Sequence, residues 1–208
     1  MFSGERSPIQ DYLPRYLNNF SNISPIASIN LTFSFGAAMQ LNDTNGHFHV
    51  AGIQTYSDLT IAMVDTQVLR SLCEFPISMV KMLTIKWYTN TTCPEASRPG
   101  DYLTLVLMTN LHTLMLNNYI NPSLIVALNP NHNTSKKVLC PKSEELILDV
   151  QMCNEYCMDE LLEMVKEQAS MHAVLLVIVI ISQQELIPME KKISRFVRHV
   201  SHVEYRFR

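Results

Sequence analysis

Glycine is scarce in this chain and is missing from its second half. The 208 residues include five glycines, and none follows Gly100. Phosphate-binding loops need glycine where a strand turns into a helix, so that the backbone can approach the anion. The strand-to-helix connections expected near residues 151–153 and 182–184 hold none. The sequence therefore has neither a P-loop nor a dinucleotide fingerprint, and we expect no bound nucleotide and no cofactor.

Long hydrophobic runs are also absent. The longest, Ala173 to Ile181, has nine residues, about half of the ~20 that a transmembrane helix needs. The first residues, Met1 to Pro8, lack the apolar core of a signal peptide. We therefore expect an intracellular protein, cytoplasmic or nuclear, that does not contact a membrane. In that compartment its five cysteines would be reduced thiols.

Motifs for metal binding and catalysis are missing as well. Cys153 and Cys157 stand four residues apart, and Cys140 with His172 could complete a zinc site beside them. However, Cys-x3-Cys is not the usual zinc spacing, so we expect buried thiols and no metal. The chain has no Gly-x-Ser-x-Gly, no His-Glu-x-x-His and no acidic calcium loop. We expect a protein that is not an enzyme.

One stretch with strict alternation organises the first half. From Ile29 to Leu41, a run of thirteen residues, every odd-numbered residue is apolar and the even-numbered ones are polar or small. Side chains on a strand point alternately to opposite faces, so the pattern predicts one long half-buried strand. A strand of this length exceeds the usual five or six residues, and Gly36 is its expected bending point.

Shorter patterns extend this strand into a β-rich domain over residues 29–130. Asn45-Gly46 predicts a hairpin to a second strand at 47–55. Apolar runs predict further strands at 58–65, 82–89, 102–109 and 124–128, and a short helix at 66–75. The order of these elements up to residue 109 is that of an OB-type barrel. We therefore expect an OB-like barrel in this half.

The C-terminal part, residues 144–208, has a different pattern. Amphipathic helices are expected near 154–168 and after Pro188, between strands at 146–150, 173–181 and 203–207. The order β-α-β-α-β predicts parallel strands and right-handed crossovers. We classify the chain as α+β, with an N-terminal arm over 1–28, a β-rich domain over 29–130 and an α/β part over 144–208. The sequence leaves open whether both halves share one sheet.

Two groups of residues are candidates for partner binding. The arm carries three aromatic residues of types enriched at protein interfaces: Tyr12, Tyr16 and Phe20. The last expected helix has four basic residues on its outer face: Lys191, Lys192, Arg195 and Arg198. The whole chain has a net charge of −3, so this basic face is a local asymmetry that would suit an acidic partner or a nucleic-acid backbone. A simple solvated helix face would look the same.

The function that these observations favour is a non-enzymatic interaction subunit of a larger multi-protein assembly. Residues 102–128 carry apolar side chains at odd and even positions alike, which a small domain of strands could not bury, so we expect other protein subunits to cover them. One alternative is an OB-like, DNA-associated protein that contacts nucleic acid directly or through partners. Another is a secreted or viral glycoprotein without its leader, suggested by six N-x-Ser/Thr sequons: Asn19, Asn22, Asn30, Asn42, Asn90 and Asn133.

Overall fold

In the part of the chain that it describes, the computed structural model has eight strands, two α-helices and a short 3-10 helix, besides single helical turns at 104–107 and 194–196. It describes residues 25–33, 36–46, 48–54, 72, 77–87, 104–118, 122–132, 138–140, 142–150, 155–171, 175–182 and 194–207. The strands are β1 (Ile26–Phe33), β2 (Gly36–Asp43), β3 (Phe48–Gln54), β4 (Met82–Trp87), β5 (Thr113–Asn118), β6 (Glu145–Val150), β7 (Val177–Ser182) and β8 (His202–Phe207). The helices are α2 (Pro122–Leu128), α3 (Glu155–Ser170) and the 3-10 helix η4 (Ile77–Met79).

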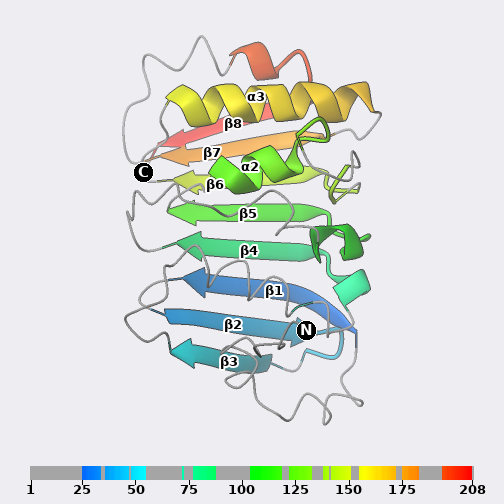
Figure 1. The fold of residues 1–208 in the computed structure, drawn as a ribbon, viewed down its shortest axis with the longest axis vertical. Helices are drawn as coiled ribbons and strands as arrows, with labels where there is room; N and C mark the ends of the chain where they lie inside the picture. Colours follow the sequence, from blue (N-terminus) through cyan, green and yellow to red (C-terminus); the bar gives the residue numbers. More distant parts are fainter. Residues whose placement is uncertain are drawn as a thin grey trace, which may run out of the picture.

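All eight strands form one open sheet in the order β3-β2-β1-β4-β5-β6-β7-β8 (Figure 1). The pairs β3-β2 and β2-β1 are antiparallel, and every other neighbouring pair is parallel. The fold is therefore α/β, and the predicted OB-like barrel in an α+β chain is wrong. Hydrophobic alternation reports that a strand is half buried, but it reports neither the direction of a strand nor where one strand ends and the next begins, and both separate this sheet from the predicted barrel.

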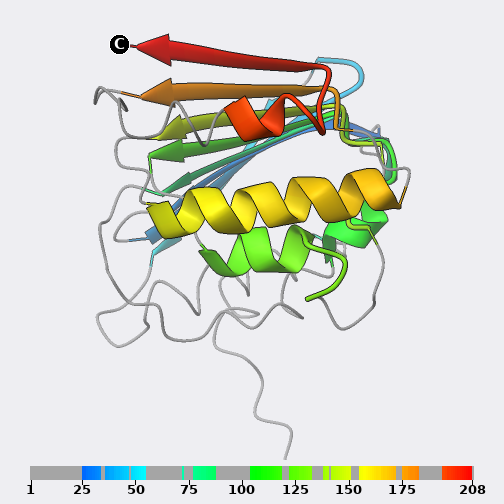
Figure 2. The same cartoon turned by 90° about the horizontal axis from the view of Figure 1, so that it is seen from above.

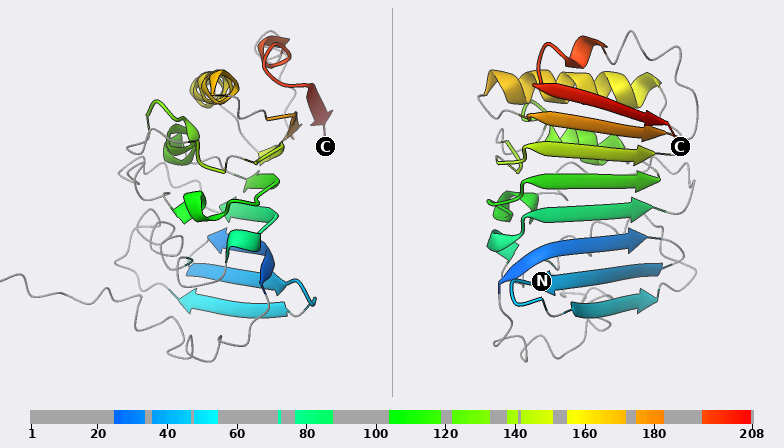
Figure 3. Two further views of the ribbon diagram at one scale, coloured as in Figure 1. Left: turned by 90° about the vertical axis from the view of Figure 1, so that its right-hand side faces the viewer. Right: turned by 180° about the vertical axis from the view of Figure 1, so that it is seen from behind.

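The described helices all lie on one face of the sheet (Figures 2 and 3). From β4 to β8 each new strand is added on the same side of the previous one. Parallel strands added in one direction by crossovers of one hand leave all their connections on a single face. The other face is crossed by none of the described elements, and we call it the open face.

A repeated pattern of buried side chains accompanies the parallel strands. Three strands share the spacing apolar-x-x-apolar-x-apolar: Val80, Leu83 and Ile85 for β4; Leu111, Leu114 and Leu116 for β5; Leu175, Ile178 and Ile180 for β7. Register partners in β5, β6 and β7, such as Thr113, Glu145 and Val177, follow one another at intervals of 32 residues. One strand and one covering segment therefore form a unit that is stacked several times, as in solenoid proteins.

The main chain repeats the same contacts at the start of these strands. One carbonyl oxygen before each strand accepts hydrogen bonds from two amide groups of the next unit. Lys81 accepts from His112 and Thr113 at 2.9 and 3.0 Å, His112 from Glu144 and Glu145 at 2.9 Å each, and Glu144 from Leu176 and Val177 at 2.8 and 2.9 Å. These bonds fix the register, so that odd and even positions of neighbouring strands stay aligned across the sheet.

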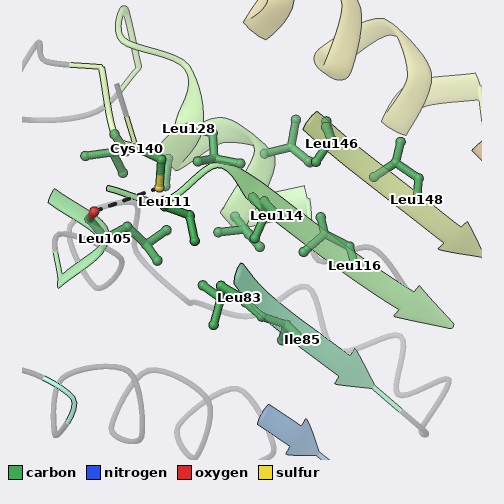
Figure 4. Packing of buried hydrophobic residues seen from close by; sticks show 14 of the residues in the cluster. Leu83, Ile85, Leu105, Leu111, Leu114, Leu116, Leu128, Cys140, Leu146 and Leu148 are labelled. Atoms are coloured by element: carbon green, nitrogen blue, oxygen red, sulfur yellow. Dashed lines mark hydrogen bonds between the residues drawn. The ribbon is translucent and has the colours of Figure 1, made fainter. Parts of the chain in front are cut away.

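The hydrophobic core fills the space between the sheet and the helices (Figure 4). Helix α3 buries Leu161, Leu162 and Val165 in it, which confirms the helix predicted near 154–168. Gln168 near the end of α3 is also buried, and its Nε2 donates to the Leu128 carbonyl oxygen at 3.1 Å. This bond satisfies one of the carbonyl groups that the end of α2 leaves without an intrahelical partner.

The predicted thirteen-residue strand is instead a pair of antiparallel strands, β1 and β2. Ile29 pairs with Leu41, Leu31 with Met39 and Phe33 with Ala37. Odd-numbered residues thus pair with odd-numbered residues, and the apolar face continues across the chain reversal. The face assignment is confirmed for the buried Ile29, Leu31, Phe33, Met39 and Leu41, whereas the single long strand is wrong.

Two predicted strands in the middle of the chain are wrong as well. Residues 104–107 form a 3-10 turn, and the apolar run at 124–128 belongs to helix α2. Together with β5 these elements bury most of the apolar residues that were expected to need a partner, including Leu105, Met108 and Leu124. Leu107 is an exception, with 46% of its surface exposed. A turn, a strand and a helix can direct side chains from odd-numbered and even-numbered positions into one core. Two strands cannot do so, because alternate side chains on a strand point to opposite faces.

Other predictions divide between confirmed elements and undescribed ones. The hairpin at 42–46 is confirmed, with Gly46 at a φ of +83° between β2 and β3. Strands β4, β6, β7 and β8 match predicted strands within a few residues, and β6 to β8 are parallel as expected. The arm up to residue 24, the strand at 58–65 and most of the helix at 66–75 lie outside the described residues.

Candidate interaction surface

The register of the sheet decides which side chains reach the open face. Leu114, Leu116, Leu146 and Leu148 belong to the core on the helix side (Figure 4). Because neighbouring residues on a strand point to opposite faces, the residues between them point to the open face. Met115 and Ile147 are of this kind, are partly exposed and are register partners of each other.

Three rows of register partners cross the parallel strands on the open face. The middle row runs from β1 to β8 through Asn30, Thr84, Met115, Ile147, Val179 and Glu204. One flanking row contains Thr32, Lys86, Asn117, Asp149, Ile181 and Arg206, and the other contains Ser28, Met82, Thr113, Glu145, Val177 and His202.

Apolar residues concentrate toward the β5 to β7 end of this face. Val179 and Ile181 are only 4% and 7% exposed, yet neither belongs to the core cluster on the helix side. They lie between the side chains of β6 and β8, and with Met115 and Ile147 they form a continuous apolar area on three neighbouring strands.

Charged and polar groups surround this apolar area. Thr113 Oγ1 donates to Glu145 Oε2 at 3.0 Å, and Arg206 pairs with Glu204 at the β8 edge. Beside Lys86, the Asn117 side chain is 7% exposed, and its Oδ1 has no hydrogen-bond partner. A buried acceptor without a donor costs about 1–3 kcal/mol, so Asn117 is a locally unfavourable position of this face.

The Glu204–Arg206 pair sets the charge state of the β8 edge. Arg206 Nε and Nη2 donate to the two carboxylate oxygens of Glu204 at 2.6 and 2.9 Å. The hydrogen bond from Arg206 holds the pKa of Glu204 below its ordinary value, and the same bond raises the pKa of Arg206. Both side chains therefore remain charged throughout the physiological range.

The helix side holds a small cavity next to Cys140. Leucines of β5 and β6, together with Met164 and Gln168 of α3, line it, and its volume is about 10 Å³, room for roughly one water molecule. A cavity of this size is far smaller than the roughly 300–1,000 Å³ of small-molecule sites.

Cys140 itself is a structural residue of that region. Burial raises the pKa of its thiol to about 12, and the Sγ contacts the Leu105 carbonyl oxygen at 3.8 Å (Figure 4). The thiolate is the form that ligates metals and attacks electrophiles. A thiol that stays protonated in this way packs as a small apolar group.

The residues predicted to bind partners are not on the open face where the structure describes them. Arg195 and Arg198 are exposed and lie on or beside a short helical turn at 194–196, which is on the helix side (Figure 2). The remaining candidates lie outside the described residues: Tyr12, Tyr16, Phe20, Lys191 and Lys192. Whether the two predicted groups lie together therefore stays a prediction.

Sequence reasoning missed the open face because it missed the repeat. The recurring spacing Leu111-x-x-Leu114-x-Leu116 and Leu175-x-x-Ile178-x-Ile180 is visible in the sequence. A search for internal similarity at intervals near 32 residues would have indicated stacked units. Stacked units with parallel strands imply helices on one side and an open face on the other.

The described ranges contain neither a metal site nor a helix that could span a membrane, and comparison with known proteins adds no family. Within the ranges that the structure describes, no group of three His, Cys, Asp or Glu side chains is placed to hold a metal ion. None of the helices in these ranges combines the length and hydropathy needed to span a bilayer. No protein-family model, no curated protein and no solved structure matches the chain.

Proposed function

We propose that this chain is a non-enzymatic interaction module of a multi-protein assembly and that it binds a partner protein through the open face. The observation that carries the proposal is a broad sheet face, partly apolar, that no described element covers. Solenoid-like stacks of this kind create extended surfaces suited to binding other macromolecules.

The size of the open face supports a protein as the partner. Eight strands spaced about 4.8 Å apart extend over roughly 34 Å, and six residues rise about 20 Å, which gives close to 700 Å². A standard protein interface buries about 800 Å² on each partner. The face is therefore as large as one side of an ordinary protein complex.

The composition of the open face also favours a protein over nucleic acid. The apolar area of Met115, Ile147, Val179 and Ile181 lies within a polar surround, the usual anatomy of a protein interface. Its charges are mixed: Lys86 and Arg206 are basic, while Glu145, Asp149 and Glu204 are acidic. A nucleic-acid backbone would require an excess of basic residues.

We place the module inside the cell, in the cytoplasm or nucleus. The support is Cys140, which is a buried free thiol. Structural thiols that are not oxidised are typical of reducing compartments. Fluorescence microscopy of the tagged chain in its source cells would test this location, and a signal confined to the secretory pathway would contradict it.

A matched pair of substitutions tests the role of the open face. Ile147→Glu places a charge in the apolar area, whereas Val197→Glu makes the same kind of change at a side chain that is 62% exposed on the helix side. The tagged wild-type chain is used to capture partner proteins from its source cells. Each captured protein is then purified and titrated against the wild-type chain and both variants. We expect Ile147→Glu to abolish binding of the partner and Val197→Glu to leave it unchanged.

The contrary result is equally clear. If a purified partner binds wild type and Ile147→Glu with the same affinity, and Met115→Glu also has no effect, the partner does not use the open face. Circular dichroism melting of each variant shows that a loss of binding is not a loss of folding.

A further inference from the structure

The turn between β2 and β3 contains Asn45, the only asparagine of the sequence that is followed by glycine. The Asn45 amide donates to Asp43 Oδ1 at 2.9 Å, and the Gly46 amide donates to the Asp43 carbonyl oxygen at 3.2 Å. The second of these bonds is at the long end of the usual N–H···O range. Asn45 and Gly46 are both exposed, and a Cβ atom added at Gly46 would meet no atom within 4 Å. The main chain at Gly46 is therefore weakly held and has open space beside it.

An asparagine that precedes a glycine can react with its own main chain. The amide nitrogen of the next residue attacks the side-chain carbon Cγ, so that a bond from this nitrogen to Cγ forms and the bond from Cγ to the side-chain nitrogen breaks. The proton of the attacking nitrogen passes through water to the side-chain nitrogen, which leaves as ammonia. Water then opens the cyclic imide at either of its carbonyl groups and gives aspartate or isoaspartate. Glycine favours the first step because it has no side chain to obstruct the attack and its main chain adopts conformations that other residues avoid.

We propose that Asn45 is a site of spontaneous deamidation, with Gly46 as the attacking residue and water as the other reactant, and that the isoaspartate formed loosens strand β3. The geometry of the turn supports the proposal. The bond from the Gly46 amide must break before its nitrogen can attack, and it is the longer of the two bonds that Asp43 accepts in this turn. Exposure of both residues gives water access to the imide.

The product disturbs the turn in two ways. Isoaspartate carries the main chain through the former side-chain carbon and lengthens it by a methylene group, whereas the length of a hairpin turn sets the register in which Asn42 pairs with Phe48. The product also adds a carboxylate two residues from that of Asp43, and like charges repel. Among the described strands β3 pairs with β2, so a change in this turn acts directly on that pairing.

A second turn provides a matched control within the same molecule. After α2, the Asn131 amide donates to Asn129 Oδ1 at 3.0 Å, and the His132 amide donates to the Asn129 carbonyl oxygen at 3.1 Å. Asn131 is exposed, as Asn45 is. The two turns have the same pair of hydrogen bonds, while histidine takes the place of glycine. A difference in reactivity between the two asparagines therefore reports the effect of the residue that follows.

Peptide mass spectrometry of the whole chain during incubation at mildly alkaline pH measures both sites in one sample. We expect Asn45 to convert at least about tenfold faster than Asn131, which corresponds to a barrier lower by about 1.4 kcal/mol. Gly46→Ala should slow the conversion of Asn45 to a rate close to that of Asn131. His132→Gly changes an exposed residue and places glycine after Asn131, so it should raise the rate at Asn131 at least about tenfold.

Amide hydrogen exchange measures the effect on the strand. After incubation the wild-type chain should exchange faster in β3 than before, and Gly46→Ala should show no change. Each chain is compared with itself before incubation, which removes the effect of any difference in initial stability. Equal rates at Asn45 and Asn131, or an unreactive Asn131 in His132→Gly, overturn the reaction assigned to Gly46. Conversion of Asn45 without faster exchange in β3 overturns the effect on the strand.

Discussion

Replacing two adjacent residues of β6 would measure the difference between the two faces of the sheet directly. Leu148 is fully buried in the core on the helix side, and Ile147 is partly exposed on the open face. Both substitutions to alanine remove three carbon atoms from the same strand. What differs is the surface that each side chain withdraws from water and the cavity that its loss leaves behind.

The structure sets the expected magnitudes. Loss of three buried carbon groups from Leu148 costs about 2.4 kcal/mol at ~0.8 kcal/mol each, and the remaining cavity adds about 1 kcal/mol or more. We therefore expect Leu148→Ala to lower the free energy of unfolding by about 3–4 kcal/mol. Ile147→Ala removes a partly exposed side chain and should cost about 1 kcal/mol.

Equilibrium unfolding in urea, followed by circular dichroism, provides the assay. The slope of free energy against urea concentration should be the same for both variants, because it reflects the surface exposed on unfolding. If Ile147→Ala destabilises the chain as much as Leu148→Ala, the assignment of the two faces is wrong, and with it the proposal that the open face is available to a partner.

Three further predictions concern the turn, the buried thiol and the helix contact. Gly46→Ala should cost about 1 kcal/mol, because an added methyl group meets no neighbouring atom but the backbone is held at a positive φ, and Gly46→Asn should cost less. The raised pKa of Cys140, about 12, keeps the thiol protonated, so iodoacetamide at pH 8 should leave this residue unlabelled in the native chain and label it in denaturant, as read by peptide mass spectrometry. Gln168→Ala removes the donor to the Leu128 carbonyl and should cost about 1–2 kcal/mol in urea unfolding, whereas the exposed Glu163→Ala should change stability by less than about 0.5 kcal/mol; equal effects would contradict the buried bond.

The first half of the chain illustrates what alternation can and cannot predict. The pattern from Ile29 to Leu41 correctly separates buried from partly exposed residues, because odd-numbered residues of β1 pair with odd-numbered residues of β2. The same odd-with-odd pairing hides the reversal of the chain, since two antiparallel strands in this register show the alternation of one continuous strand. The OB-like barrel was predicted partly because β1 and β2 were treated as one long strand.

Short apolar runs caused the other errors in the fold. Residues 124–128 fit a strand or a buried helix equally well, and length alone could not decide. Pro122 was the overlooked signal, because proline is favoured at the first position of a helix and α2 begins there. In the C-terminal part the helix α3 and the strands around it were predictable, because their hydrophobic patterns are longer or more uniform.

The candidate site was much harder to predict than the elements that carry it. Met115, Ile147 and Val179 are far apart in the sequence and become neighbours through the register of three strands. Each looks like an ordinary apolar residue of a buried strand when it is read alone. The apolar surface exists only where the strand units are stacked side by side. It can be recognised in the sequence once the units are aligned at their spacing of about 32 residues.

Stacking also implies how the molecule opens in solution. In the described parallel part each inner strand is held by a neighbour on both sides, whereas β8 is held by β7 alone. Fluctuations that break main-chain bonds should therefore begin at β8 and progress inward, unit by unit, as in other one-dimensional arrays. Amide hydrogen exchange in β5 should be orders of magnitude slower than in β8. The residues of the middle strands would then keep a fixed geometry during openings that release the end of the sheet.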